Sequence, residues 1–284
     1  MESNNVLFTD ISDFVKYVPN VALGNDFEKV KLNCINATNK HILKLVDESI
    51  LTNADSQIIE FLKHAQANYA AFEMTRIANT ILTKQGSMNV ESEKLKANFG
   101  DKQDTLSFYA ETGDTYMDLL LVYLKKNNID NSKQVSTTFF SSLEEFEGYK
   151  FLSGSHRTFI ALLPYLTKVE KLFIIPRLGN KLQDVLSSAS LVSLREAIRG
   201  YVANTAVLSA IPHLKLRYSD GITVSTFISS MQAKFDKDER ECVEKSIQKD
   251  IDDYSERLEL ELNKLFYSES PQFENKVENK GWAF

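Results

Sequence analysis

Residues 62–72 read LKHAQANYAAF, and residues 194–204 read LREAIRGYVAN. The two stretches lie 132 positions apart, and both place small and apolar residues three and four positions apart. That spacing is typical of one buried face of an α-helix. The residues shared at this offset are Leu62 and Leu194, Ala65 and Ala197, Tyr69 and Tyr201, and Ala71 and Ala203. The pattern predicts the same core-facing helix twice in one chain.

The match extends in both directions without a gap, from Phe27–Leu82 against Phe159–Leu214. Few residues are identical, but the matches fall on apolar and small positions, where close packing restricts the choice of side chain. Further helices are expected at about 26–47 and 105–126 in the first copy and at about 236–266 in the second. The last helices match at an offset of 138, with Asp114 and Tyr116 echoed by Asp252 and Tyr254. The sequence therefore predicts a duplicated helical unit.

Helix-breaking residues predict where elements end. The long helices are expected at about 55–83 and 190–211, with Pro212 stopping the second. Pro176 is expected to break the preceding helix near Ile175, and Gly179 to mark its end. Residues 213–224 alternate apolar and polar side chains around Ser219-Asp220-Gly221, which predicts a short β-hairpin. A weaker equivalent is expected at 83–90.

The expected fold is mainly α: two diverged repeats of a helical-bundle unit, a short β-hairpin in the second, and extended terminal arms. The predicted boundaries are an N-terminal arm at 1–26, unit 1 at 27–126, a linker at 127–158, unit 2 at 159–266 and a C-terminal arm at 267–284. The linker contains several aromatic residues, so we expect it to be packed. The C-terminal arm contains Pro271 and ends in Trp282-Ala283-Phe284.

The composition is that of a folded globular protein, with 43% hydrophobic and 25% charged residues. No apolar run reaches the roughly 20 residues needed to cross a bilayer, and the N-terminus lacks the pattern of a secretory signal. Cys34 and Cys242 either form a bridge or remain reduced, and reduced thiols are favoured. The net charge of −6 argues against a protein that wraps nucleic acid.

Charge is divided unevenly along the chain. Residues 157–217 contain nine Lys and Arg against three Asp and Glu, whereas residues 218–284 contain nine against fifteen. Such a division allows head-to-tail pairing between copies, but two solvated faces explain it at least as well.

Residues that carry chemistry are scattered. There is no phosphate-binding Gly-rich loop, no zinc-binding spacing and no nucleophile elbow, and the four histidines stand apart. Acidic residues between Asp250 and Glu261 suggest either metal ligands or a solvated helix face, and the solvated face is favoured. Arg157 and Arg177, which lie near Gly154 and Gly179, suggest an anion site only weakly. We therefore expect no catalytic residue, no cofactor and no metal site.

The second unit resembles a known family. The stretches that carry the resemblance are FFSSLEEF at 139–146, SGSHRTF at 153–159, LLPY at 162–165, IIPRLG at 174–179, IRGYVA at 198–203, AIP at 210–212 and SDGI at 219–222. They resemble a virion-associated family encoded by tailed phages and prophages of Bacteroidetes, including crAss-like phages. The first unit departs from this pattern, with Lys44 in place of Pro176 and Asp47 in place of Gly179.

The resemblance implies a structural virion protein similar to head-to-tail connector or adaptor rings. It implies a homo-oligomeric ring, a dodecamer, that docks on the portal protein and on neighbouring tail or ring proteins. DNA would pass through its channel without sequence-specific binding, and no membrane is involved. Assembly would take place in the bacterial host cytoplasm. The rival hypotheses are a cytoplasmic helical-repeat scaffold or binding module and a helical metalloenzyme.

Candidate interface residues follow from the charge pattern and from the aromatic C-terminus. Trp is enriched among the residues that anchor interfaces, and a free terminus has little reason to end in Trp-Ala-Phe. The predicted interface residues are Trp282, Phe284, Phe273, Arg157, Arg177, Arg199 and Arg217.

Overall fold

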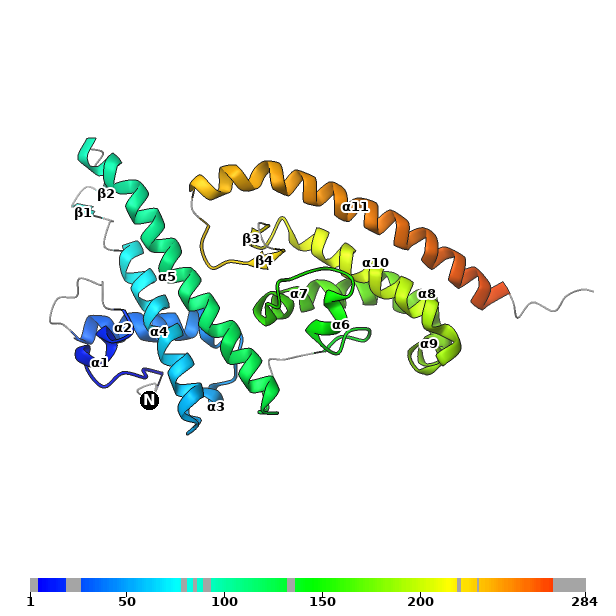
Figure 1. The fold of residues 1–284 in the computed structure, drawn as a ribbon, viewed down its shortest axis with the longest axis horizontal. Coiled ribbons are helices and arrows are strands. Elements are labelled where there is room, and N and C mark those ends of the chain that lie inside the picture. The colour runs from blue at the N-terminus through cyan, green and yellow to red at the C-terminus, as the bar shows by residue number, and fades with distance from the viewer. Residues whose placement is uncertain are drawn as a thin grey trace, which may run out of the picture.

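The computed structural model describes residues 5–18, 27–77, 81–83, 86–88, 93–131, 136–218, 221–228 and 230–267. The fold is mainly α, as predicted, and Figure 1 shows two helical units side by side. The first unit contains α1 (Ile11–Val15), α2 (Phe27–Ala37), a π-helical turn η1 (Thr38–Ile42), α3 (Glu48–Leu51), α4 (Ser56–Ile77), β1 (Ile81–Thr83), β2 (Gly86–Met88) and α5 (Glu93–Lys126).

The second unit repeats this order with a longer connection before its central helix. It contains α6 (Leu143–Glu147), α7 (His156–Val169), a π-helical turn η2 (Glu170–Ile174), α8 (Ile175–Leu178), η3 (Gly179–Lys181), α9 (Leu182–Ser187), η4 (Ala189–Leu191), α10 (Val192–Ala210), β3 (Leu216–Arg217), β4 (Thr223–Val224) and α11 (Ser230–Tyr267).

The π-helical turns confirm the duplication at the level of the backbone. η1 and η2 both follow the first long helix of their unit. η2 begins and ends 132 positions after η1 begins and ends. π-helical turns are rare in proteins. Finding one at the matching place in each unit therefore supports a common origin for the two halves.

The repeat begins earlier than the sequence predicts. α1 and α6 are also 132 positions apart, and each begins at a capping side chain, Asp10 or Ser142, that accepts a hydrogen bond from a backbone N–H three residues later. Phe14 and Phe146 occupy matching buried positions on these short helices. The described part of the predicted N-terminal arm and residues 136–158 of the predicted linker are thus packed starting segments of the two units, whereas Asn131 of the linker donates to the Leu45 carbonyl of unit 1 (2.9 Å).

The first residue of each π-helical turn holds the starting segment in place. The buried Thr38 hydroxyl donates to the backbone oxygen of Asn5 (3.2 Å). At the matching place, the buried Glu170 carboxylate accepts hydrogen bonds from the Thr137 hydroxyl (2.7 Å) and from the Thr138 N–H (3.0 Å). The two units therefore make the same connection with different chemistry.

Each core is built on one long helix pair, α4 with α5 and α10 with α11. Both pairs approach closely where a glycine faces a tyrosine ring. A Cβ atom added at Gly113 would lie 2.7 Å from the Tyr69 ring, and one added at Gly200 would overlap the Tyr254 ring. On α11, the apolar residues that contact the second core are Val243, Ile247, Ile251, Leu258, Leu262 and Leu265.

Several predicted bounds need correction. The first helix ends at Ala37 and continues as a π-helical turn, and α4 ends at Ile77 rather than near 83. α5 and α11 begin at Glu93 and Ser230, earlier than predicted. The break expected near Ile175 is present as the boundary between η2 and α8, and Pro176 lies in the first turn of α8, where its missing N–H needs no partner. Gly179 ends α8, as predicted.

The predicted hairpin is present, since β3 pairs antiparallel with β4 and Leu216 lies opposite Val224. The weaker first hairpin is also present, with Ile81 opposite Met88.

Both cysteines are free: Cys34 is buried, which raises the pKa of its thiol to about 12, and Cys242 is exposed. None of the helices in the described part of the chain combines the length and apolar composition needed to cross a membrane.

Candidate functional site

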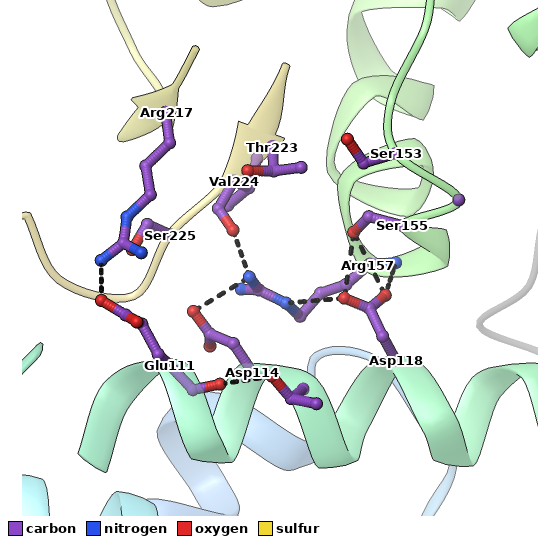
Figure 2. A pocket seen from close by; sticks show the side chains of 12 residues that line it. Glu111, Asp114, Asp118, Ser153, Ser155, Arg157, Arg217, Thr223, Val224 and Ser225 are labelled. Carbon is purple, nitrogen blue, oxygen red and sulfur yellow. Dashed lines mark hydrogen bonds and ion pairs between the residues drawn. The ribbon is translucent and has the colours of Figure 1, made fainter. Parts of the chain in front are cut away.

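The two units meet at a polar junction between α5 and the second unit. A pocket of 280 Å³ lies there, formed by the middle of α5, the loop before α7, the start of α7 and the β3–β4 hairpin. Figure 2 shows its side chains, and we call it the junction pocket. Its lining residues are Glu111, Asp114, Thr115, Asp118, Ser153, Gly154, Ser155, Arg157, Arg217, Thr223, Val224 and Ser225.

Arg157 is the central cation of the junction pocket. It lies in the first turn of α7, and its side chain is only 9% exposed. Its guanidinium is 3.0 Å from the Asp114 carboxylate and 3.9 Å from that of Asp118, and it donates a hydrogen bond to the Val224 carbonyl. Burial lowers the pKa of Arg157, but the nearby acidic groups, led by Asp114, more than reverse this. The side chain therefore remains a buried cation.

Asp114 joins three segments that are distant in sequence. From α4, the Tyr69 hydroxyl donates to its carboxylate (2.7 Å). After β4, Thr226 donates through its hydroxyl (2.6 Å) and its backbone N–H (3.0 Å). Burial, followed by the charge of Asp114, raises the pKa of Tyr69 well above its usual value, so the phenol stays protonated and donates. Asp114 thereby connects the second unit to the core of unit 1.

Asp118 holds the start of α7. Its carboxylate accepts hydrogen bonds from the Ser155 hydroxyl (3.1 Å) and from the backbone N–H of Arg157 (2.9 Å). A helix begins with unpaired N–H groups and a partial positive charge, so a carboxylate at this place is stabilising. Burial raises the pKa of Asp118, and the charge of Arg157 opposes that increase.

A second arginine closes the junction pocket. Arg217 on β3 donates to the Glu111 carboxylate on α5 (2.6 Å) and to the Phe227 carbonyl (3.3 Å). The buried Nε atoms of Arg157 and Arg217 make no hydrogen bond with the described part of the chain. Polar cavities of this kind hold ordered water. Chemically the arrangement is a clamp of paired charges that fixes one unit against the other.

The four predicted interface arginines all form pairs within the chain, two of them in the junction pocket and two elsewhere. Arg157 and Arg217 line the junction pocket. Arg177 on α8 pairs with Glu259 on α11 (2.6 Å), and both side chains are largely exposed. Arg199 on α10 donates to the Phe139 carbonyl (2.8 Å) and pairs with Glu145 (3.2 Å). Arg157 is therefore an interior residue rather than a surface one, and the weakly suggested anion site is not assembled.

The other predicted residues have simpler outcomes. Phe273, Trp282 and Phe284 lie outside the described residues. Most of the acidic side chains of α11 are exposed, as expected for a solvated helix face, and Asp250 pairs with Lys150 (3.1 Å). Within the described residues, no group of three or more His, Cys, Asp and Glu side chains is placed to hold a metal ion.

Tyr69 and Tyr201 both contact the core of their own unit from the matching central helix. Tyr69 is fully buried beside the junction, whereas Tyr201 is only partly buried. Sequence reasoning missed Asp114 and Asp118 as junction residues. One signal was present, because Asp114 recurs as Asp252 in the second copy, but a repeated residue does not reveal which distant cation it meets.

Comparisons with known proteins place the chain in a family. The family described as "Family of unknown function (DUF6712)" matches residues 24–137 and 173–279, one stretch in each repeated half. No curated protein and no solved structure matches the chain. Because the two matched stretches cover well over half of its length, the chain belongs to family DUF6712.

Proposed function

We propose that this protein is a structural component of a tailed-phage virion, a head-to-tail connector that forms a ring beneath the portal. The resemblance of its second unit to the phage virion family supplies the biological setting. Family DUF6712 has no assigned function, so its match neither adds to this proposal nor opposes it.

The observation that carries the proposal is a group of large, exposed apolar side chains in each unit. α5 exposes Phe108 (60%), Leu119 (44%) and Val122 (44%) on its outer side. In the second unit, η2 exposes Leu172 (58%) and Phe173 (48%). Single exposed apolar residues are ordinary, whereas groups of them mark interaction surfaces. One such group on each unit gives a subunit two unlike surfaces.

Two unlike surfaces are what head-to-tail assembly requires. Contacts between unlike surfaces produce a closed ring when the rotation between neighbours completes a circle. The rotation must be constant, so the subunit has to be stiff. The buried pairing of Arg157 with Asp114 fixes the two units against each other and supplies that stiffness.

The charge of the chain suits a DNA channel. A net charge of −6 and the mostly exposed acidic side chains of α11 disfavour adhesion to phosphate groups. Nonspecific binding to DNA depends on Lys and Arg that neutralise phosphates. A channel wall of this composition would let DNA pass without holding it.

The experiment is mass photometry of the purified chain, alone and with the portal protein from the same genome, followed by electron microscopy of any large species. We expect one closed ring, a dodecamer. A monomer or small open oligomer under every condition, including with the portal, would refute the connector. It would favour the alternative of a cytoplasmic helical-repeat scaffold or binding module. Metal found in stoichiometric amount by elemental analysis would instead support the metalloenzyme.

A further inference from the structure

A second pocket lies on the first unit, away from the junction. It has a volume of 190 Å³ and is formed by the residues after α1, by α4 and by α5. Aromatic rings make up most of its lining, so we call it the aromatic pocket. Its residues are Tyr17, Val18, His64, Asn68, Phe108, Tyr109, Thr112 and Tyr116.

The walls of the aromatic pocket are fixed by ring contacts. Tyr116 stacks on His64 with ring centroids 4.0 Å apart, and Tyr17 meets His64 edge-on at 4.7 Å. The Tyr17 hydroxyl donates to Glu60 (3.0 Å). Burial lowers the pKa of His64, so its ring is neutral near pH 7. Phe108 belongs both to this lining and to the exposed apolar side of α5.

This aromatic surface is not a general requirement of the repeated fold. At the repeat offset of 138, Ser246 stands in the place of Phe108 and Arg257 in the place of Leu119. The second unit folds with these polar residues exposed on α11. The first unit therefore exposes rings that its own packing does not need, which points to a binding role.

The size of the aromatic pocket indicates the type of occupant. Pockets for drug-sized ligands usually measure about 300–1,000 Å³, so 190 Å³ suits a single side chain better than a free metabolite. Neutral rings around such a space suit an aromatic side chain, because ring pairs gain from edge-on and offset contacts. The chain contains one tryptophan, Trp282, and it is followed two positions later by the terminal Phe284.

We propose that the aromatic pocket binds the C-terminal residues 268–284 of a neighbouring copy, with Trp282 or Phe284 as the inserted ring. The proposal rests on the proposed homo-oligomer and names a contact within it. The source of the segment follows from its reach. Trp282 and Phe284 lie fifteen and seventeen residues beyond the end of α11, so a fully extended chain carries them at most about 54 Å and about 61 Å.

The pocket of the same chain lies toward the opposite end of the molecule from the end of α11. α11 has 38 residues and is about 57 Å long at about 1.5 Å per residue. Figure 1 shows its C-terminal end at one side of the molecule and α1 at the other, beyond the start of α11. A neighbouring copy is not subject to this separation, so we assign the segment to a neighbouring copy.

The first test measures binding of a fluorescein-labelled synthetic peptide with the sequence of residues 268–284. The receptor is the full chain carrying Trp282→Ala and Phe284→Ala, so that its own C-terminus does not compete. We expect saturable binding that weakens more than about tenfold when Phe108→Ser is added to the receptor or when the peptide carries both alanines. The matched control is Phe151→Ser, which removes a phenylalanine of equal exposure (61%) from the second unit and should change binding less than about twofold.

The outcomes separate this proposal from the proposed function. Absence of saturable binding, or equal binding to receptors with and without Phe108→Ser, overturns the aromatic pocket as the docking site, even if the wild-type chain forms rings. Specific peptide binding by a chain that never forms rings upholds the docking site and refutes the connector. Because Phe108 is 60% exposed, its replacement should leave the melting temperature unchanged, which serves as the folding check.

A second test decides between binding within a chain and between chains. One copy carries Thr112→Cys and another carries Ala283→Cys, both with the exposed Cys242 changed to serine. We expect a disulfide-linked dimer from the mixture under mild oxidation. A cross-link that forms only when both cysteines are in one chain would overturn the assignment to a neighbouring copy.

Discussion

Replacing Arg157 by methionine should destabilise the protein by about 3–5 kcal/mol, the usual cost of breaking a buried ion pair from one side. The side chains of Arg157 and Asp114 are each only 9% exposed, and 3.0 Å separates their charged groups. Methionine fills much of the same volume but leaves the Asp114 charge without its cation. Tyr69 and Thr226 continue to donate hydrogen bonds to Asp114, so we expect the lower part of the range.

The assay is urea unfolding at pH 7, with Arg177→Met as the matched control. Arg177 pairs with Glu259 at 2.6 Å, but the two side chains are 42% and 53% exposed, so its loss should cost less than about 1 kcal/mol. Adding Asp114→Asn to Arg157→Met should recover part of the lost stability, because the unpaired charge is then removed. If Arg157→Met costs no more than Arg177→Met, the junction is not a buried clamp and the reasoning fails.

Three further predictions test other parts of the structure. Gly200→Ala should lower the free energy of unfolding by about 1–3 kcal/mol, measured by thermal melting, because the new methyl group overlaps the Tyr254 ring. The control Gly148→Ala places its methyl group in an ordinary van der Waals contact and should leave the stability nearly unchanged in the same assay. Glu170→Ala should cost about 1–3 kcal/mol in urea unfolding, because the buried Phe139 N–H and the partly buried Thr137 hydroxyl lose their acceptor, and an unchanged midpoint would contradict this. Burial lowers the folded-state pKa of three histidines, His41, His64 and His156. The free energy of unfolding should therefore fall as the pH drops below about 6.5, because the unfolded chain then binds more protons than the folded one. Replacing the three histidines by glutamine should flatten that pH dependence.

The sequence was sufficient to predict the helices and their duplication, because both leave local periodic patterns. The apolar positions of α4 and α10 recur every three or four residues, and Pro212 limits the second helix. The starting segments were harder to recognise. Their shared features are a capping residue and a few aromatic residues such as Phe14 and Phe146 among unlike neighbours, so the match is too sparse to separate from chance.

The junction could not be predicted, because its partners are distant in sequence. Asp114 meets Thr226 across 112 positions and Tyr69 across 45, and no local pattern joins them. Charge counts pointed to the arginines as interface residues, but the Arg157 side chain is buried within the chain. A long side chain looks the same in sequence whether it reaches solvent or a buried carboxylate, and the packing of α7 on α5 decides which it reaches.

The two units differ where one of them meets the other. In unit 1, Asp114 is buried under the second unit, whereas its counterpart Asp252 is exposed on α11 and accepts a hydrogen bond from Gln248 within the same helix (2.9 Å). A duplicated unit whose matching faces have diverged in this way does not continue as an array of a third and fourth unit, because the next junction lacks its buried partner. The divergence leaves a chain with two unlike ends, an aromatic one on unit 1 and a charged one on α11. In the proposed homo-oligomer, contacts between unlike surfaces of this kind would close into a ring or extend as a filament.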